Sequence, residues 1–97
     1  MTFTIRSQAH RDIAEAVEYY LGEQTPQSAE RFADAVDVAY DEIIDTPYLS
    51  RVVQYGLREK RVKGFPFVVL YSVEESGIVI VAIYHDRRKR SKLRDRI

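Results

Sequence analysis

The chain has 97 residues, of which 45% are hydrophobic and 31% charged. This length and composition predict one soluble globular domain over residues 1–97, with room for one modest core. The absence of cysteine excludes disulfides, a thiol nucleophile and thiolate metal sites, and the two histidines lack partners at metal-ligand spacing. We therefore expect no metal and no other cofactor. No stretch has the length of a membrane span and no secretory signal pattern is present, so we expect a cytoplasmic protein.

The formal net charge is zero, but the two halves of the chain have opposite charge. Residues 1–46 carry three basic and ten acidic side chains, a net of −7. Residues 47–97 carry twelve basic and five acidic side chains, a net of +7. Such segregation is typical of a basic face that binds an anionic or acidic partner. The alternative is that water simply solvates the charges of each half.

The N-terminal half of the sequence predicts a strand and two helices. The first residues alternate between apolar and polar, which is typical of a short strand. Apolar residues then recur at helical spacing between Ser7, a candidate cap, and Gly22, a candidate helix end. A second helix begins after Thr25, with Pro26 at its first position, and ends before Pro47. The short link between them predicts an antiparallel helical hairpin.

The C-terminal half predicts three strands after a loop. Residues 57–62 form the first, in which Arg58 and Lys60 share one face. Two apolar stretches, 67–73 and 77–84, flank a turn and predict a β-hairpin. The element order is thus β-α-α-β-β-β. We predict an α+β fold, with the helical hairpin packed on one face of a small, mainly antiparallel sheet.

Both faces of the predicted β-hairpin are apolar. The helices cover one face, and the other needs a cover from the loop at 48–55, the tail, a second subunit or another protein. Because large exposed apolar patches mark interaction sites, we predict that an obligate protein partner covers this face. The residues expected to bind it are Val68, Leu70, Val79, Val81 and Ile83.

A basic segment, His85-Asp86-Arg87-Arg88-Lys89-Arg90, follows the last predicted strand directly. Rigid scaffolds often present functional side chains at such strand ends, and guanidinium groups bind anions. We predict a target-binding cluster there, made of Arg58, Lys60, Arg61, His85, Arg87, Arg88 and Arg90. The basic tail, residues 87–97, has Leu93 and Ile97 four apart, which fits either a short amphipathic helix or a frayed end.

Several motifs follow one another from about residue 2 to residue 90. They are Ala9-x-x-Asp12-Ile13, Tyr19-Tyr20, Ala29-x-x-Phe32, Pro47, Leu57-Arg58, Gly64-Phe65-Pro66-Phe67, Leu70-Tyr71 and Ile83-x-His85-x-Arg87-Arg88. This ordered set resembles the ParE/RelE superfamily of bacterial toxins from type II toxin–antitoxin systems, and the ParE branch more than the RelE branch. The resemblance implies a small α+β toxin that its cognate antitoxin neutralises by laying a helix and an extended segment across it.

The resemblance also implies a target. ParE-type toxins poison DNA gyrase, whereas RelE-type toxins cleave mRNA in the ribosome. By resemblance we expect a gyrase inhibitor that arrests growth, without catalytic activity, in a hetero-oligomer with its antitoxin. The antitoxin would then be the partner that covers the second apolar face.

Two alternatives remain open. A RelE-like, ribosome-dependent mRNA endonuclease would use His85 as acid or base, with Arg58, Lys60 and Arg87 stabilising the phosphate charge. RelE-like nucleases usually carry a tyrosine near the C-terminus, but none follows His85 here, and Tyr84 should face the opposite way. A structural role for His85 is therefore the simpler interpretation. The other alternative is a degenerate toxin that only binds its antitoxin.

Overall fold

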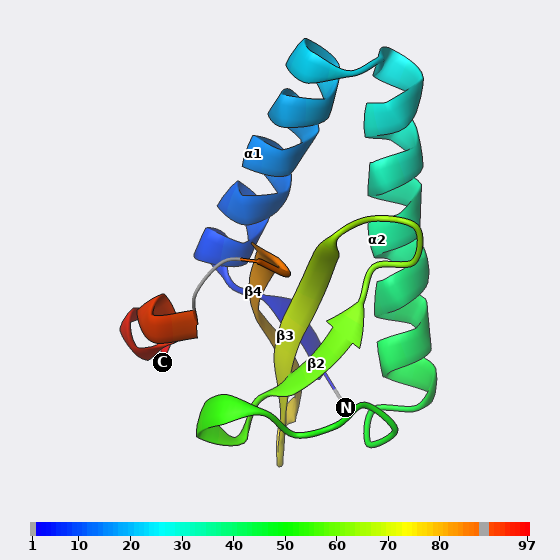
Figure 1. The fold of residues 1–97 in the computed structure, drawn as a ribbon. Coiled ribbons are helices and arrows are strands. Elements are labelled where there is room, and N and C mark those ends of the chain that lie inside the picture. Colours follow the sequence, from blue (N-terminus) through cyan, green and yellow to red (C-terminus); the bar gives the residue numbers. More distant parts are fainter. Residues whose placement is uncertain (1, 88–89) are drawn as a thin grey trace.

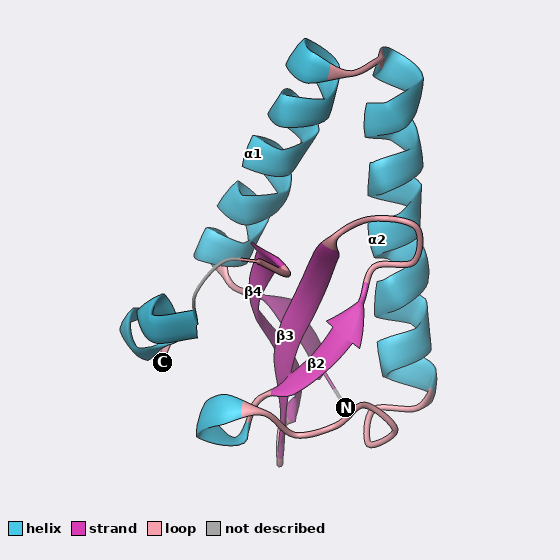
Figure 2. Cartoon of the chain, viewed as in Figure 1, coloured by secondary structure: helices cyan, strands magenta, loops and turns pink. Residues whose placement is uncertain are grey.

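The computed structural model describes residues 2–87 and 90–97. In these residues the main elements are, in chain order, β1 (Thr2–Ile5), α1 (Ser7–Glu23), α2 (Pro26–Asp45), β2 (Arg58–Arg61), β3 (Phe67–Glu74) and β4 (Gly77–His85). Short 3₁₀ helices occur at Gln54–Gly56 and at Arg90–Arg96, the latter called the tail helix below. The helical hairpin packs on the sheet (Figure 1), and its tip extends beyond the strands (Figure 2). The predicted fold class and element order are confirmed.

The strands form one mixed sheet over the described residues, in the order β1-β4-β3-β2. β1 pairs with β4 in parallel, and the other pairs are antiparallel. The register shifts within the β3–β4 pair, because Leu70 lies opposite Ala82 while Tyr71 lies opposite Ile80. Val81 is therefore an extra residue in β4, a β-bulge.

The bulge reverses the alternation of β4 from this point on. Val81 packs in the core on the side away from the helices, whereas Ile83 packs in the core beneath them. The prediction that these two residues share one face is wrong, because one inserted residue moves every later side chain to the other face. His85 and Tyr84 lie on opposite faces, as the sequence predicts.

The two helices begin differently. At α2 the Thr25 hydroxyl accepts a hydrogen bond of 3.1 Å from the N–H of Ser28, as predicted. α1 begins at Ser7 itself, after Arg6, whose side chain makes no capping bond. The predicted cap at Ser7 is therefore wrong. Both helices end close to their predicted ends.

The main core lies between the helical hairpin and the sheet, and aromatic rings fill much of it. The ring centroid of Phe32, from α2, lies 5.3 Å from that of Phe65 and 5.1 Å from that of Phe67. Tyr71 is fully buried, and its hydroxyl donates a 2.8 Å hydrogen bond to the carbonyl of Pro47. This bond fixes the start of the loop that connects α2 to β2.

A second, smaller core lies on the opposite face of the sheet, and its strand residues are Val68, Leu70, Val81, Ala82 and Tyr84. Leu57, just before β2, and Leu93, from the tail helix, complete this core. Leu93 is 0% exposed. The strands separate α2 from the tail helix (Figure 1).

The prediction that an outside partner must cover this second face is therefore wrong for the free chain, because the chain's own loop and tail cover it. Val68, Leu70 and Val81 are buried there, and Val79 is partly buried against the same cluster. Among the described residues, no helix is both long and apolar enough to cross a membrane.

Candidate functional site

A buried ion pair fastens the tail to the rest of the fold. The carboxylate of Asp12, on α1, accepts hydrogen bonds from the guanidinium of Arg96 at 2.8 and 2.9 Å. It also accepts a bond of 2.9 Å from the N–H of Ile83, just beyond the bulge. The hydrogen bond to Asp12 raises the pKa of Arg96. Asp12 and Arg96, called the clasp below, thus join α1, β4 and the tail helix.

His85 ends β4 and lies in a small polar cluster. Its ring contacts Phe67 edge-on, with centroids 5.4 Å apart. Its Nδ1 accepts a 3.2 Å hydrogen bond from the N–H of Arg87, so the neutral ring carries its proton on Nε2. Asp86 lies 3.5 Å from the same Nδ1 and accepts a 3.3 Å bond from Arg61. The sheet end therefore brings together Arg61, His85, Asp86 and the main chain of Arg87.

Two adjoining hollows flank His85, with volumes of about 170 and 390 Å³. Both are lined by Tyr19, Phe67 and His85, and the smaller is also lined by Asp12 and Glu15. Tyr19 is 53% exposed. A tyrosine therefore does share a hollow with His85, although it comes from α1 rather than from the C-terminal segment. The sequence offered no signal for this proximity.

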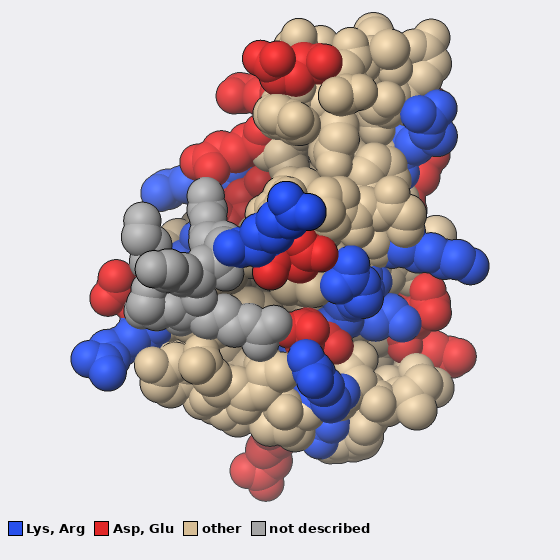
Figure 3. All heavy atoms as spheres, in the orientation of Figure 1, with Lys and Arg blue, Asp and Glu red and all other residues tan. Residues whose placement is uncertain are grey.

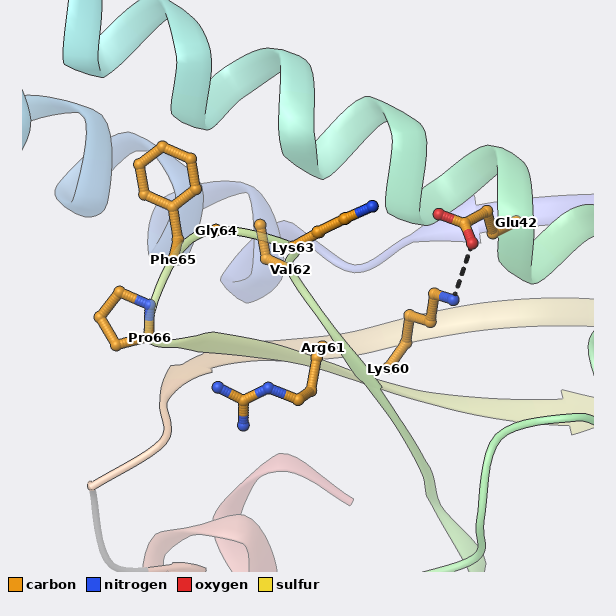
Figure 4. A pocket seen from close by; sticks show the side chains of 8 residues that line it. All are labelled: Glu42, Lys60, Arg61, Val62, Lys63, Gly64, Phe65 and Pro66. Atoms are coloured by element: carbon orange, nitrogen blue, oxygen red, sulfur yellow. Dashed lines mark hydrogen bonds and ion pairs between the residues drawn. The ribbon is translucent and has the colours of Figure 1, made fainter.

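A larger hollow, of about 560 Å³, lies between α2 and the turn after β2 (Figure 4). It is lined by Glu42, Lys60, Arg61, Val62, Lys63, Gly64, Phe65 and Pro66. The ammonium of Lys60 lies 3.1 Å from the carboxylate of Glu42. In Figure 4 the side chains of Lys60 and Lys63 extend toward α2, whereas that of Arg61 points away from it. The hollow thus holds two cations and one carboxylate on its α2 side.

The predicted target-binding residues do not form one cluster. Arg58 and Lys60 share a face, as predicted, since they lie opposite Tyr71 and Val69, which are both in the main core. The guanidinium of Arg58, however, donates to two loop carbonyls, those of Tyr48 at 3.1 Å and Ser50 at 2.6 Å. It braces the loop.

Arg61, His85 and Arg87 meet at the end of the sheet, while Lys60 belongs to the hollow beside α2. Arg88 and the side chain of Arg90 lie outside the described residues. Lys and Arg side chains gather over β2 and the turn after it, with acidic side chains among them (Figure 3). Across the described ranges, no group of three or more His, Asp or Glu residues is placed to hold a metal ion.

The comparisons with known proteins agree with this architecture. The family model described as the ParE toxin of type II toxin–antitoxin systems, parDE, matches residues 3–90. The chain belongs to this family. A solved structure from the chromosomal ParDE toxin–antitoxin system of P. aeruginosa is similar, with a TM-score of 0.78 over 88% of this chain and 95% of that one. Its sequence identity is 17%, so the likeness shows the fold alone. A comparison with curated protein sequences finds no match.

Within this ParE-family fold, sequence reasoning missed the clasp and the position of Tyr19. The one local signal for the clasp was Asp12, a carboxylate among the regularly spaced apolar residues of α1. A buried carboxylate requires a partner, because an unpaired one is costly. The sequence could not show that the partner, Arg96, lies at the other end of the chain.

Proposed function

We propose that this ParE-family toxin inhibits DNA gyrase through protein contacts, without chemistry of its own, and that a cognate antitoxin neutralises it in the cytoplasm. One observation carries the proposal: three of the four side chains that the nuclease alternative would use are engaged in contacts within the fold. The basic end of the sheet then serves as a binding surface.

Three of the four candidate nuclease residues support this interpretation. Cleavage of RNA requires an acid and a base at the scissile phosphate, and cations that are free to bind it. The guanidinium of Arg58 is engaged with loop carbonyls, and Lys60 is paired with Glu42. His85 uses Nδ1 to accept a bond from the main chain of Arg87, which leaves one ring nitrogen for any partner.

The same contacts suit a rigid protein-binding surface. Arg61 and Asp86 link the turn after β4 to β2, and His85 packs on Phe67. Side chains held in one conformation lose little entropy on binding, which favours protein–protein contacts. We expect Arg61 and Arg87 to contact acidic groups of the target.

A gyrase supercoiling assay tests the proposal. We expect the purified chain to block supercoiling of relaxed plasmid or to trap cleaved DNA. For the double variant Arg61→Ala, Arg87→Ala, we expect the concentration that inhibits gyrase to rise by about tenfold or more, because two charge contacts with the target are lost. Arg11→Ala, an exposed cation on α1, serves as the matched control. No effect of the parent chain on gyrase at micromolar concentration would refute the proposal.

The RelE-like endonuclease is the second candidate, and Tyr19 is the observation that favours it. Tyr19 and His85 line the same two hollows, so a second titratable group lies near the histidine. Primer extension on translated mRNA separates the two functions. Cuts that disappear in Tyr19→Phe and His85→Ala would support the nuclease. Growth that continues during expression without antitoxin would instead support the degenerate toxin.

A further inference from the structure

The loop between α2 and β2 exposes a strip of large apolar side chains. Leu49 is 79% exposed, Tyr48 65%, Val52 54% and Tyr55 49%. These four residues are called the loop strip below. At these exposures the strip presents roughly 400–500 Å² of surface, as much as the largest apolar patch of a typical monomer, and such patches are often functional.

Tyr55 has a backbone conformation that tyrosine rarely adopts. Its φ is 58° and that of Gly56 is 73°, and the N–H of Leu57 donates to the carbonyl of Gln54 at 3.0 Å. Two consecutive positive φ values closed by such a bond are typical of a type I′ turn, where glycine, asparagine and aspartate prevail. A tyrosine there is strained, and strained residues cluster at binding sites. The turn thus holds a half-exposed aromatic ring at its tip, at a cost that a smaller polar residue would avoid.

Contacts within the fold hold the loop strip in place. The guanidinium of Arg58 donates to the carbonyls of Tyr48 and Ser50 and lies 5.2 Å from the centre of the Tyr48 ring. The N–H of Val53 donates to the carbonyl of Leu57 at 2.7 Å, next to the turn. Because these contacts order the main chain beforehand, the strip loses little loop entropy when it binds a partner.

The loop strip runs along one end of the molecule. In Figure 1 the loop between α2 and β2 crosses the lower end, away from the tip of the helical hairpin. Residues 51–53 run antiparallel to the start of β2, since Val52 forms a bridge with the first residue of that strand. Val52 therefore lies at the middle of the strip. Tyr48 and Leu49 lie on one side of it and Tyr55 on the other.

The loop strip carries no net charge. Arg51 is the only charged residue between positions 46 and 57, and its guanidinium lies 3.5 Å from the carboxylate of Glu59. The rest of the chain is strongly charged, with a net of −7 over residues 1–46 and +7 over residues 47–97, so surfaces rich in either charge repel their own copies. At the strip, a second copy meets a neutral apolar surface identical to its own.

We propose that the loop strip joins two copies of this chain in a weak, two-fold symmetric dimer. Because the same surface occurs on both sides of a two-fold interface, the two strips lie antiparallel. The two Val52 side chains meet at the axis, and each Tyr55 ring packs on the partner's Tyr48 and Leu49. The strips bury about 800–1,000 Å² in total, close to the lower limit for a specific interface, so we expect a dissociation constant of about 10–100 µM.

The dimer leaves the basic end of the sheet free. The strip lies at the start of β2, whereas Arg61 ends β2 and meets Asp86 there. The dimer therefore carries two copies of the proposed target-binding surface, which strengthens binding to any target that has two sites. The dimer forms whichever target the toxin binds, so its test does not depend on gyrase.

Sedimentation equilibrium of the purified full chain, from micromolar to millimolar concentration, measures the association. We expect a reversible change from monomer to dimer. Leu49→Ser and Tyr55→Asn should each raise the dissociation constant by about tenfold or more, because each removes a large apolar contact on both sides of the axis. Leu21→Ser is the matched control, since Leu21 is 52% exposed and lies near the tip of the helical hairpin. It should leave the association unchanged.

Tyr55→Asn also separates association from folding. Asparagine tolerates positive φ better than tyrosine does, so the variant should unfold at a higher urea concentration than the parent. Both are compared at low micromolar concentration, where association adds little to stability. If the variant unfolds at a lower urea concentration instead, Tyr55 stabilises the fold, and its assigned role at the interface is wrong.

The chain has no cysteine, so single cysteines can test the geometry of the dimer. Val52→Cys should form a disulfide-linked dimer on mild oxidation, because the two copies of this residue meet at the axis and a disulfide needs Cα atoms within about 7 Å. A mixture of Leu49→Cys and Tyr55→Cys should form the mixed disulfide far more readily than either variant forms a disulfide with itself. Leu21→Cys should remain monomeric.

Three results would overturn the proposal. They are a chain that stays monomeric at millimolar concentration, a dimer that the strip variants do not weaken, and equal crosslinking of Val52→Cys and Leu21→Cys. A monomeric chain whose Leu49→Ser variant inhibits gyrase less would overturn it too, because the strip would then contact the target. A dimer that leaves gyrase active refutes only the proposed function, whereas a monomer that inhibits gyrase refutes only the dimer.

Discussion

The two faces of the sheet are both apolar but are covered in different ways. α1 and α2, of 17 and 20 residues, cover one face, and aromatic rings fill the space beneath them. The tail helix, of 7 residues, completes the cover of the other face with the buried side chain of Leu93. The clasp between Asp12 and Arg96 fastens that tail.

The difference indicates two levels of stability within one fold. Ordering a residue costs about 1–2 kcal/mol of backbone entropy, whereas burying one leucine contributes about 1.5–3 kcal/mol. The described contacts that hold the seven-residue tail helix are made by Leu93 and by Arg96, which meets Asp12, the carbonyl of Val81, the ring of Tyr84 and the side chain of Arg6. We therefore expect the tail helix to open at a lower free energy than the helical hairpin. The helical hairpin thus supplies most of the stability of the fold, whereas the tail helix only covers the second face of the sheet.

The largest effect is expected on the helix side. Phe32→Ala removes a fully buried ring that contacts Phe65 and Phe67. We expect the free energy of unfolding to fall by about 3–5 kcal/mol, because the cavity cannot collapse between the rings of Tyr20, Phe65 and Phe67. Urea denaturation followed by circular dichroism measures this. A loss below about 1 kcal/mol would mean that the hairpin does not depend on this ring.

The next effect tests the clasp. Arg96→Met leaves the Asp12 carboxylate buried on α1 without its cation, and we expect a loss of about 3 kcal/mol or slightly more. The double variant Asp12→Asn, Arg96→Met should recover most of that loss, because no charge is then buried and the Asn oxygen still accepts from Ile83. Denaturation of both single variants and the double variant gives the coupling energy. Additive losses would contradict a direct pair.

The elements that the sequence predicts correctly are those with local signals. Thr25 and Pro26 specify the start of α2 because a cap and a fixed φ act within one turn. The helical spacing of apolar residues and the apolar runs of the strands likewise predict the element order, because both patterns are local in the sequence. These patterns do not depend on residues far away in the chain.

The features that the sequence did not predict depend on residues far apart in the chain or on alternatives that fit the sequence equally well. Asp12 and Arg96 lie 84 positions apart, so no local pattern connects them. The bulge at Val81 falls within an unbroken apolar run, where either alternation fits the sequence equally well. The sequence predicts Arg58 to be a cation that binds the target. In the structure its guanidinium donates to loop carbonyls instead, and the positions of those carbonyls cannot be inferred from the sequence.

A smaller effect is expected on the tail side. Leu93→Ala should release the tail and expose Val68 and Leu70, but lower the global stability by no more than about 1.5–3 kcal/mol. Hydrogen exchange then distinguishes the two faces: amides of the tail helix should exchange much faster, while those of α2 change little. Equal acceleration in α2 would show that the two faces unfold together.

The smallest effect concerns Tyr40, on the helix side. Its hydroxyl is buried and has no hydrogen-bond partner among the described residues, and its ring lies 5.5 Å from Phe3. Tyr40→Phe should therefore raise the free energy of unfolding by about 1 kcal/mol, because the desolvation cost of the hydroxyl disappears.

The pH dependence of that gain tests its cause. Burial raises the pKa of Tyr40, with a further contribution from Asp37. Above about pH 10 the unfolded chain ionises this hydroxyl while the folded chain keeps it protonated, so the unfolded state binds fewer protons and stability falls as pH rises. The phenylalanine variant lacks this loss. Its advantage over the parent should thus grow between pH 9 and 11, as measured by urea denaturation at each pH. If the difference in the free energy of unfolding between the variant and the parent stays constant over this pH range, the hydroxyl of Tyr40 is in contact with water in the folded chain. The core on the helix side would then be open to water at this point.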